Sequence, residues 1–150
     1  MKTYVLGFAF KGDNVLLIKK NRPDWAAGKL NGIGGHVEPF EGGMLHLAMV
    51  REFVEETGIQ SDPIQWDHIA RITHPNKAVV EIFRSFNINI YKAVSTTDEP
   101  VECIDVETVY HMNTESIIPN LRYLLPVLHT APRDMEEIFN FITPNPGDYL

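Results

Sequence analysis

The sequence lacks the features that mark several large classes of protein. Of its 150 residues only Cys103 is a cysteine, so no intrachain disulfide can form and a reducing compartment is expected. No apolar stretch approaches the roughly 20 residues that span a bilayer. The short apolar run at residues 4–10 is followed at once by a polar turn, not by a cleavage site. We therefore expect a cytoplasmic protein that has no membrane segment.

Positive charge is also scarce. The chain has 13 Lys and Arg residues against 20 Asp and Glu, which gives a formal net charge of −7. A protein that binds polymeric nucleic acid needs a basic surface, so that class is not expected. A small phosphorylated ligand remains compatible with this charge, because bound cations can invert it locally. The six histidines show no metal-ligand spacing such as H-E-x-x-H, and ordinary packing roles are expected for them.

What is present is typical of one folded domain over residues 1–150. Hydrophobic residues make up 44% and charged residues 22%, close to globular averages. The pattern predicts strands at residues 3–10, 15–18, 64–73, 79–94 and 101–106, and helices at residues 44–57, 117–128 and 133–142. Pro126 suggests that the second helix ends early or kinks. This mixture indicates an α+β or α/β sandwich.

The helix predicted at residues 44–57 carries the most informative side chains. It contains no proline or glycine and ends at Gly58, a residue suited to the position after a helix. Successive helical residues differ by about 100°, which places Glu52, Glu55 and Glu56 on one face. Three apolar residues are expected to point the opposite way, into a core: Leu47, Val50 and Val54.

A face with three carboxylates favours a divalent cation. Like charges at i, i+4 oppose a helix by roughly 0.2–0.5 kcal/mol per pair. Carboxylate oxygens suit Mg²⁺ or Mn²⁺, and Mg²⁺ is commonly shared between carboxylates and substrate phosphates. Arg51 is expected to pair with a neighbouring carboxylate and fix its rotamer. The alternative interpretation is a solvated acidic helix face without a ligand.

The residues before this helix strengthen the first interpretation. Residues 31–41 read Asn-Gly-Ile-Gly-Gly-His-Val-Glu-Pro-Phe-Glu and lead a glycine-rich segment into the acidic helix. Taken together, the segment resembles the Nudix box, G-x5-E-x7-R-E-U-x-E-E-x-G-U, where U is a bulky aliphatic residue. The matching positions are Gly35, Glu41, Arg51, Glu52, Glu55, Glu56, Gly58 and Ile59.

The match departs from the family pattern at two places. Nine residues, not seven, separate Glu41 from Arg51, and Phe53 occupies the first aliphatic position. The extra residues are expected to lengthen the loop at residues 40–44. They leave the structural role of Glu41 open, whereas the helical part keeps its spacing.

The resemblance implies a Nudix fold, with a mixed sheet between helices, and a hydrolase that cuts diphosphate linkages. Glu52, Glu55 and Glu56 would bind Mg²⁺ or Mn²⁺, and Glu52 or a neighbour would help to deprotonate water. The Gly34 carbonyl lies where the family often supplies a backbone ligand. The family often adds an acid from a later loop. Three are available in this chain, and the first choice is Glu99, ahead of Asp98 and Glu102.

Residues outside the box suggest a substrate. Residues 28–35 resemble the corresponding segment of Nudix enzymes that hydrolyse oxidised purine nucleoside triphosphates such as 8-oxo-dGTP, in which an asparagine at the place of Asn31 binds the base. Asn31 would therefore read the base and Trp25 would stack on it, while Lys20 and Arg22 would hold phosphates. The alternatives are a turn asparagine, a tryptophan packed on the domain surface and solvated charges at a strand end.

Three functional hypotheses remain open at this point. The first is cleavage of a nucleoside triphosphate to the monophosphate and pyrophosphate. The second is hydrolysis of ADP-ribose or a related dinucleotide, which Pro75 favours because some ADP-ribose-cleaving members carry a proline at a similar distance after the box. The third is a non-catalytic ligand sensor, although sensors tend to lose the box carboxylates that are present here. The sequence is compatible with a monomer or a homodimer.

Overall fold

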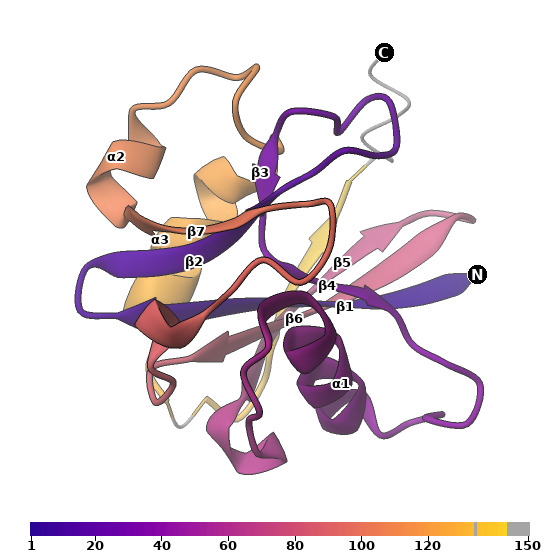
Figure 1. Ribbon diagram of the computed structural model, residues 1–150. Coiled ribbons are helices and arrows are strands. Elements are labelled where there is room, and N and C mark those ends of the chain that lie inside the picture. Colours follow the sequence, from indigo (N-terminus) through magenta and orange to yellow (C-terminus); the bar gives the residue numbers. More distant parts are fainter. Residues whose placement is uncertain (134, 144–150) are drawn as a thin grey trace.

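The computed structural model describes residues 1–133 and 135–143, and the strands in them form one mixed sheet (Figure 1). The strands are β1 (Lys2–Lys11), β2 (Asn14–Lys19), β3 (Leu30–Asn31), β4 (Ile33–His36), β5 (Asp67–His74), β6 (Ala78–Ser85), β7 (Val101–Asp105) and β8 (Phe139–Ile142). Their order is β3-β2-β1-β6-β5-β8, while β4 pairs with β1 and β7 with β2. The β1–β6 and β5–β8 pairs are parallel, and the other pairs are antiparallel.

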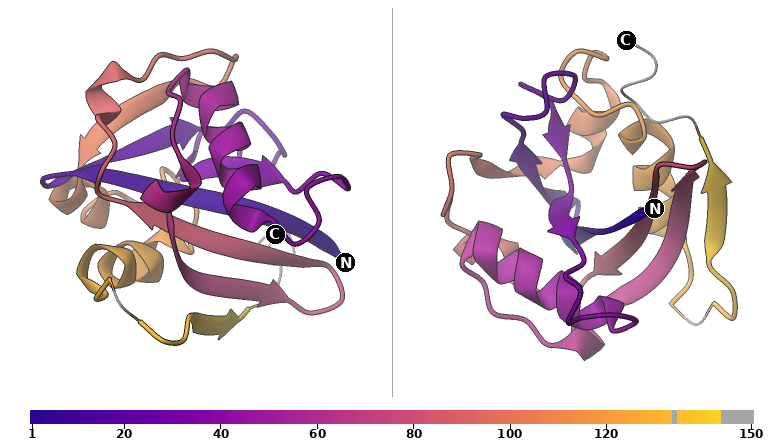
Figure 2. Two further views of the ribbon diagram at one scale, coloured as in Figure 1. Left: turned by 90° about the horizontal axis from the view of Figure 1, so that it is seen from below. Right: turned by 90° about the vertical axis from the view of Figure 1, so that its right-hand side faces the viewer.

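Helices cover both faces of this sheet (Figure 2). They are α1 (Leu45–Thr57), α2 (Val106–Tyr110) and α3 (Leu121–Thr130), with short 3-10 turns at Pro63–Gln65 and Ile90–Lys92. Alternate residues of a strand point to opposite faces. Phe8 and Phe10 of β1 accordingly pack in the core under α2 and α3, whereas Val5 and Ala9 pack in the core under α1. This arrangement confirms the α/β/α sandwich.

The helix predicted at residues 133–142 is wrong. Residues 139–142 form β8, which pairs in parallel with β5 from Ala70↔Phe139 to Thr73↔Ile142. Two long strands were also misjudged. The one predicted at 79–94 ends at Ser85, and the one predicted at 64–73 begins at Asp67, after a 3-10 turn. Both boundaries follow strand pairing, since β5 pairs with β6 from Asp67↔Arg84 and β6 pairs with β1 as far as Ala9↔Ser85.

Pro126 does not end α3, as one of the two predicted outcomes required, because the helix continues through it to Thr130. A proline inside a helix costs about 3 kcal/mol. Leu124, Leu125 and Leu128 are fully buried on either side of it. Full burial of one such side chain is worth roughly 1.5–3 kcal/mol, so packing outweighs the proline. The prediction also missed α2.

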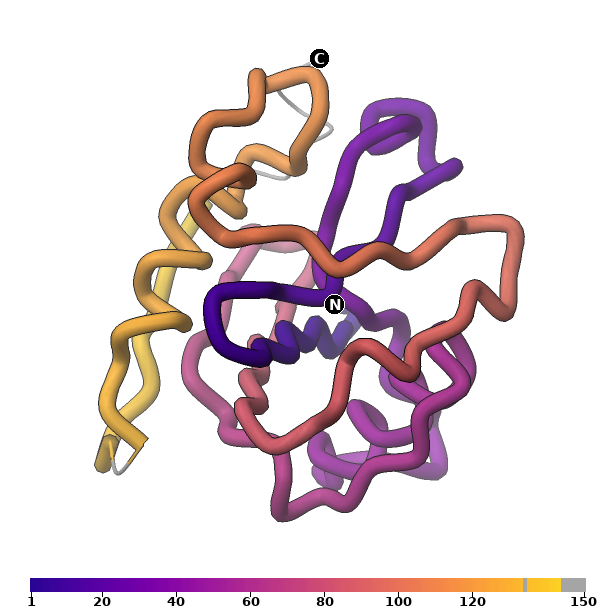
Figure 3. Tube along the Cα trace, turned by 60° about the vertical axis from the view of Figure 1, so that its left-hand side comes forward, coloured from indigo at the N-terminus to yellow at the C-terminus, as the bar shows by residue number. Residues whose placement is uncertain are grey.

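The connection between β6 and β7 runs along the C-terminal end of α1 (Figure 3). The Val94 N–H donates to the Thr57 carbonyl at 3.0 Å, and the Thr96 hydroxyl donates to the Glu55 carbonyl. Gly58 ends the helix with φ of 74°, the left-handed conformation that glycine adopts readily. These contacts tie the loop that carries Asp98 and Glu99 to the acidic helix.

Candidate active site

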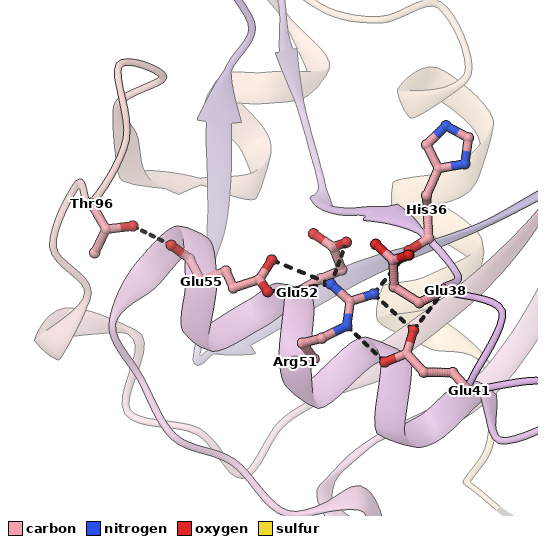
Figure 4. Close-up of polar contacts among 7 residues, drawn as sticks. All are labelled: His36, Glu38, Glu41, Arg51, Glu52, Glu55 and Thr96. Atoms are coloured by element: carbon pink, nitrogen blue, oxygen red, sulfur yellow. Dashed lines mark hydrogen bonds and ion pairs between the residues drawn. The ribbon is translucent and has the colours of Figure 1, made fainter.

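Arg51 lies at the centre of a network of acidic side chains (Figure 4). Its guanidinium makes a bidentate pair with Glu41, with Nε–Oε2 and Nη2–Oε1 distances of 2.7 and 2.8 Å. Glu41 is buried and also accepts the Glu38 N–H at 2.8 Å. The hydrogen bond from Arg51 holds the pKa of Glu41 below its usual value. The two extra residues after Glu41 therefore leave its pairing intact.

The same guanidinium positions the helix acids. Arg51 Nη1 lies 2.9 Å from Glu52 Oε1 and 3.3 Å from Glu55 Oε2. Its Nη2 also donates to the His36 carbonyl at 2.9 Å, which ties α1 to β4. The expectation that Arg51 fixes a neighbouring carboxylate is confirmed. A planar fork with five donors suits this task better than a single ammonium would.

The glycines of β4 make room for the acids. A Cβ on Gly35 would lie 2.6 Å from Glu52 Oε1, and one on Gly34 would lie 1.9 Å from the Val5 carbonyl oxygen. The Glu52 carboxylate therefore packs directly against the backbone of the strand. This contact corrects the expected orientation of α1, because Leu47 is 45% exposed, Val50 and Val54 are only partly buried, and Glu52 is buried instead.

The buried residues of α1 are Ala48, Met49, Glu52, Phe53 and Thr57, and Glu56 is partly buried beside them. The acids thus lie at the edge of the packed face, not opposite to it. The physical reason is Gly35 of β4, whose missing side chain leaves a notch that the Glu52 carboxylate fills. Glu55 differs from the other two, because its side chain is 55% exposed and it contacts Arg51 from outside the notch.

Two of these carboxylates are costly to ionise without a cation. The pKa of Glu56 is raised to about 7, chiefly by burial and also by the nearby Glu52 and Glu99, while Lys20 and a hydrogen bond from the Gly34 backbone oppose the shift. Burial also raises the pKa of Glu52, although Arg51 opposes this. Glu56 Oε2 is buried and has no hydrogen-bond partner among the residues that the structure describes. A buried oxygen without a partner fits the position of a cation ligand.

Glu99 joins this group from the loop before β7. It is buried, and it accepts hydrogen bonds from Lys20 Nζ at 3.0 Å and from the Asn21 N–H at 2.6 Å. Burial alone would raise the pKa of Glu99, but these partners lower it on balance. Asp98 is exposed and pairs with Arg22 at 2.6 Å, and Glu102 is exposed on β7. Glu99 is therefore the best placed of the three acids considered.

The donor set fits a hard divalent cation that is shared with a substrate. Within residues 1–133 and 135–143, no three acidic, histidine or cysteine side chains already surround one point as a complete metal site. Mg²⁺ is usually bound by one or two carboxylates with waters and phosphates. Glu52, Glu56 and Glu99 satisfy that requirement, and Gly34 lies beside them, but its carbonyl as a ligand stays a prediction.

A cavity of about 820 Å³ opens next to these acids, and it brings together all of the substrate residues predicted from the sequence. They are Lys20, Arg22, Trp25 and Asn31. Lys20 pairs with the buried Glu99 and is only 22% exposed, whereas Arg22 pairs with Asp98 in an exposed pair, which fits the alternative of a solvated charge. Asn31 also accepts the Gly32 N–H at 2.8 Å, so it has a local turn contact besides its place in the cavity.

Sequence reasoning missed several residues that line this cavity. Leu6, Ile72, Val80 and Ile118 give it an apolar floor, and Asn120 adds a second amide at the start of α3. Tyr4 and His36 also line it and contact each other, with ring centroids 4.2 Å apart. The alternation of β1 could have suggested Tyr4 and Leu6, but no local pattern links them to Asn120. A smaller cavity of about 230 Å³ lies between α2 and α3, away from the acids.

Known proteins resemble the chain in sequence pattern and in fold. The model of the NUDIX domain matches residues 2–112. No curated protein matches the chain significantly. No helix among the described residues is long and apolar enough to cross a membrane.

Solved structures at low identity share the fold. A mutator MutT protein from Bacillus halodurans superposes with a TM-score of 0.66 at 16% identity, covering 96% of this chain and 91% of that one. A NUDIX hydrolase from Nitrosomonas europaea gives 0.65 at 16%, covering 95% and 79%. A MutT/nudix family protein from Enterococcus faecalis gives 0.60 at 17% over 69% of this chain, which spans only 43% of that protein. At these identities the likeness shows the fold alone.

Proposed function

Because the chain belongs to the NUDIX family, whose model matches residues 2–112, we propose that it hydrolyses a purine nucleoside triphosphate to the nucleoside monophosphate and pyrophosphate. Family membership makes it a hydrolase of diphosphate bonds. The proposal adds the nucleotide class, with an oxidised purine such as 8-oxo-dGTP as a candidate. It also adds Mg²⁺ or Mn²⁺ as the cation and a small molecule, not a nucleic-acid polymer, as the partner.

One observation carries this proposal, namely that the cavity of the predicted base-binding residues is also lined by Lys20 and Gly35, which contact Glu99 and Glu52 of the acid cluster. Lys20 and Gly34 line the end nearest Glu56, while Trp25, Asn31 and Asn120 line the same space. Its volume of about 820 Å³ lies within the range of roughly 300–1,000 Å³ that is typical of small-molecule sites. Apolar walls with a few amides suit a purine ring, whose edge offers both donors and acceptors.

The chain's own side chains would divide the work of hydrolysis. Arg51 holds Glu52 in place, and Glu52 or the neighbouring Glu56 accepts a proton from the attacking water. The water oxygen bonds to a phosphorus of the α–β linkage as the bond to the bridging oxygen breaks, and the nucleoside monophosphate and pyrophosphate leave. Lys20 and Arg22 hold phosphate oxygens. A bound divalent cation would neutralise phosphate charge and make the water more acidic.

ADP-ribose or a dinucleotide is the second candidate, because the cavity extends beyond the space that a base needs. It reaches His74 and Lys77 at the β5–β6 connection, and also Lys2. Pro75 lies in that connection, between the two strands. A second sugar-phosphate half could occupy this end. The sensor hypothesis has less support, since the three box carboxylates are all in place.

A nucleotide panel separates these candidates. We expect kcat/KM for 8-oxo-dGTP, dGTP or dATP to exceed that for ADP-ribose in saturating Mg²⁺, with pyrophosphate as the inorganic product. Excess chelator should abolish turnover of every substrate. A clear lead for ADP-ribose would replace the first candidate with the second, and full turnover in chelator would contradict the role given to the acids.

A further inference from the structure

Lys20 lies between the acid cluster and the substrate cavity. It follows β2 directly, and its side chain is 22% exposed. Its Nζ lies 3.0 Å from Glu99 Oε1, and its charge lowers the pKa of Glu56. It also lines the cavity that holds Asn31 and Trp25. The same ammonium therefore faces both the carboxylates and the space for the phosphates.

The other cations near the cluster are less well placed to neutralise Glu56 and Glu99. Arg51 is committed to Glu41, Glu52 and Glu55 on the outer side of α1. Arg22 pairs closely with Asp98 and reaches Glu99 Oε2 only at 3.9 Å. Lys20 is thus the closer of the two counter-charges that contact the buried carboxylate of Glu99.

We propose that Lys20 is an internal counter-cation, which competes with the divalent cation for Glu99 of the acid cluster and is released toward the substrate phosphates when that cation binds. This inference rests on the proposed function, since it assumes that the acids bind a cation. Without the divalent cation, Lys20 positions the Glu99 carboxylate. With the cation and the nucleotide bound, Lys20 binds a phosphate.

Charge and side-chain chemistry both support this exchange. A lysine ammonium is a compact charge on a flexible four-carbon stem, so it can move without disturbing the backbone. An ammonium and a divalent cation on the same carboxylates repel each other. The nucleotide relieves that repulsion, because its phosphates accept the released ammonium. Nucleotide and cation should therefore strengthen each other's binding, as linkage requires.

The test is the affinity for Mn²⁺ without nucleotide, measured by electron paramagnetic resonance at pH 8. Lys20→Met and Lys20→Gln remove the charge, Lys20→Arg keeps it, and Lys19→Met is the matched control on an exposed neighbour outside the cavity lining. We expect both neutral variants to bind Mn²⁺ on the order of tenfold more tightly than the wild type, as removal of a unit charge a few ångströms from a divalent ion implies. Lys20→Arg and Lys19→Met should remain within about twofold of the wild type.

A second set of variants tests whether Lys20 acts on Mn²⁺ binding through Glu99. In Glu99→Gln the gain from Lys20→Met should shrink, because the two side chains act on one another. The neutral variants should also raise KM for the nucleotide, as a lost phosphate contact requires.

The outcomes distinguish this inference from the proposed function. Unchanged or weaker Mn²⁺ binding in both neutral variants, while the wild type binds Mn²⁺ and turns over nucleotide, would overturn the role of Lys20 and leave the function standing. If the wild type neither bound Mn²⁺ nor hydrolysed nucleotide, the function and the inference would both fail.

Discussion

Glu52 is held between two neighbours of opposite character. Arg51 donates to its Oε1 at 2.9 Å from the solvent side, and Gly35 leaves an open backbone on the other side. The arginine fixes the carboxylate by charge and direction. The glycine permits the contact only because it has no side chain. Both residues belong to the box pattern, and the structure gives each a physical reason to be there.

Gly35→Ala tests this close contact. The new methyl would lie 2.6 Å from Glu52 Oε1, so the carboxylate must move away from its place beside β4. Misplacement of a reacting group by about 1 Å can cost on the order of 100-fold in rate. We expect kcat to fall between roughly tenfold and 100-fold, with little change in the melting temperature, because the end of a side chain moves and not the backbone.

Gly43→Ala is the matched control, since a Cβ there meets nothing within 4 Å. It should leave both kcat and the melting temperature close to those of the wild type. Wild-type turnover in Gly35→Ala would mean that the contact between β4 and Glu52 is unimportant for catalysis.

At the scale of elements, α1 shows what local pattern can and cannot predict. Its extent and its end at Gly58 followed from the absence of proline and glycine within it and from the glycine that stops it. Its orientation did not, because the buried face includes Glu52, a residue that an apolar pattern assigns to solvent. Only the family pattern hinted that these acids face β4.

The errors elsewhere have a common origin in contacts between distant segments. Residues 139–142 became a strand because β5 offers an edge for parallel pairing, about seventy positions earlier in the chain. Glu99 could be proposed from the resemblance, but its partners Lys20 and Asn21 could not, because they lie 79 and 78 positions earlier in the chain. Propensity is weak where tertiary pairing decides the outcome.

The β5–β6 ladder carries an ion pair whose titration predicts a pH effect on stability. Burial would raise the pKa of Glu81, but His68, whose Nε2 lies 3.5 Å from Glu81 Oε1, and the hydrogen bonds from Arg71 outweigh it and lower the pKa to about 2. A folded-state pKa below the unfolded value stabilises the protein above the unfolded pKa. That stability is lost as pH falls from the unfolded value of about 4.3 toward about 2.

Glu81→Gln should therefore lower the free energy of unfolding by about 1–2 kcal/mol at pH 7. The gap between variant and wild type should narrow at pH 3. Urea denaturation at several pH values measures it. Glu107→Gln is the control, because Glu107 pairs with His111 on the surface and exposed pairs contribute little. A gap for Glu81→Gln that stayed constant from pH 7 to pH 3 would show that the pair does not titrate as described.

At the scale of the whole molecule, four separate segments build the site. β4 supplies the glycine notch and α1 supplies Glu52 and Glu56, while Lys20 follows β2 and Glu99 precedes β7. β1 lies at the centre of this assembly, since it pairs with β2, β4 and β6. The box could be predicted because its residues are contiguous. The lining of the cavity could not be predicted from the sequence. Tyr4, Asn31 and Asn120 are far apart in the chain, and only the folded sheet and the start of α3 bring them to one cavity.

The most direct test of the central claim, that buried carboxylates of α1 bind the cation used in hydrolysis, is the turnover of Glu56→Gln. This substitution keeps the shape and removes one of several like charges, so the fold should be at least as stable as in the wild type. Glu102→Gln, on an exposed acid of β7, is the matched control and should keep wild-type kcat. In saturating Mg²⁺ we expect kcat of Glu56→Gln for the best nucleotide to fall by about 10²–10⁴-fold, as loss of a general base or a metal ligand implies. An unchanged melting temperature together with near wild-type kcat in Glu56→Gln would contradict the account.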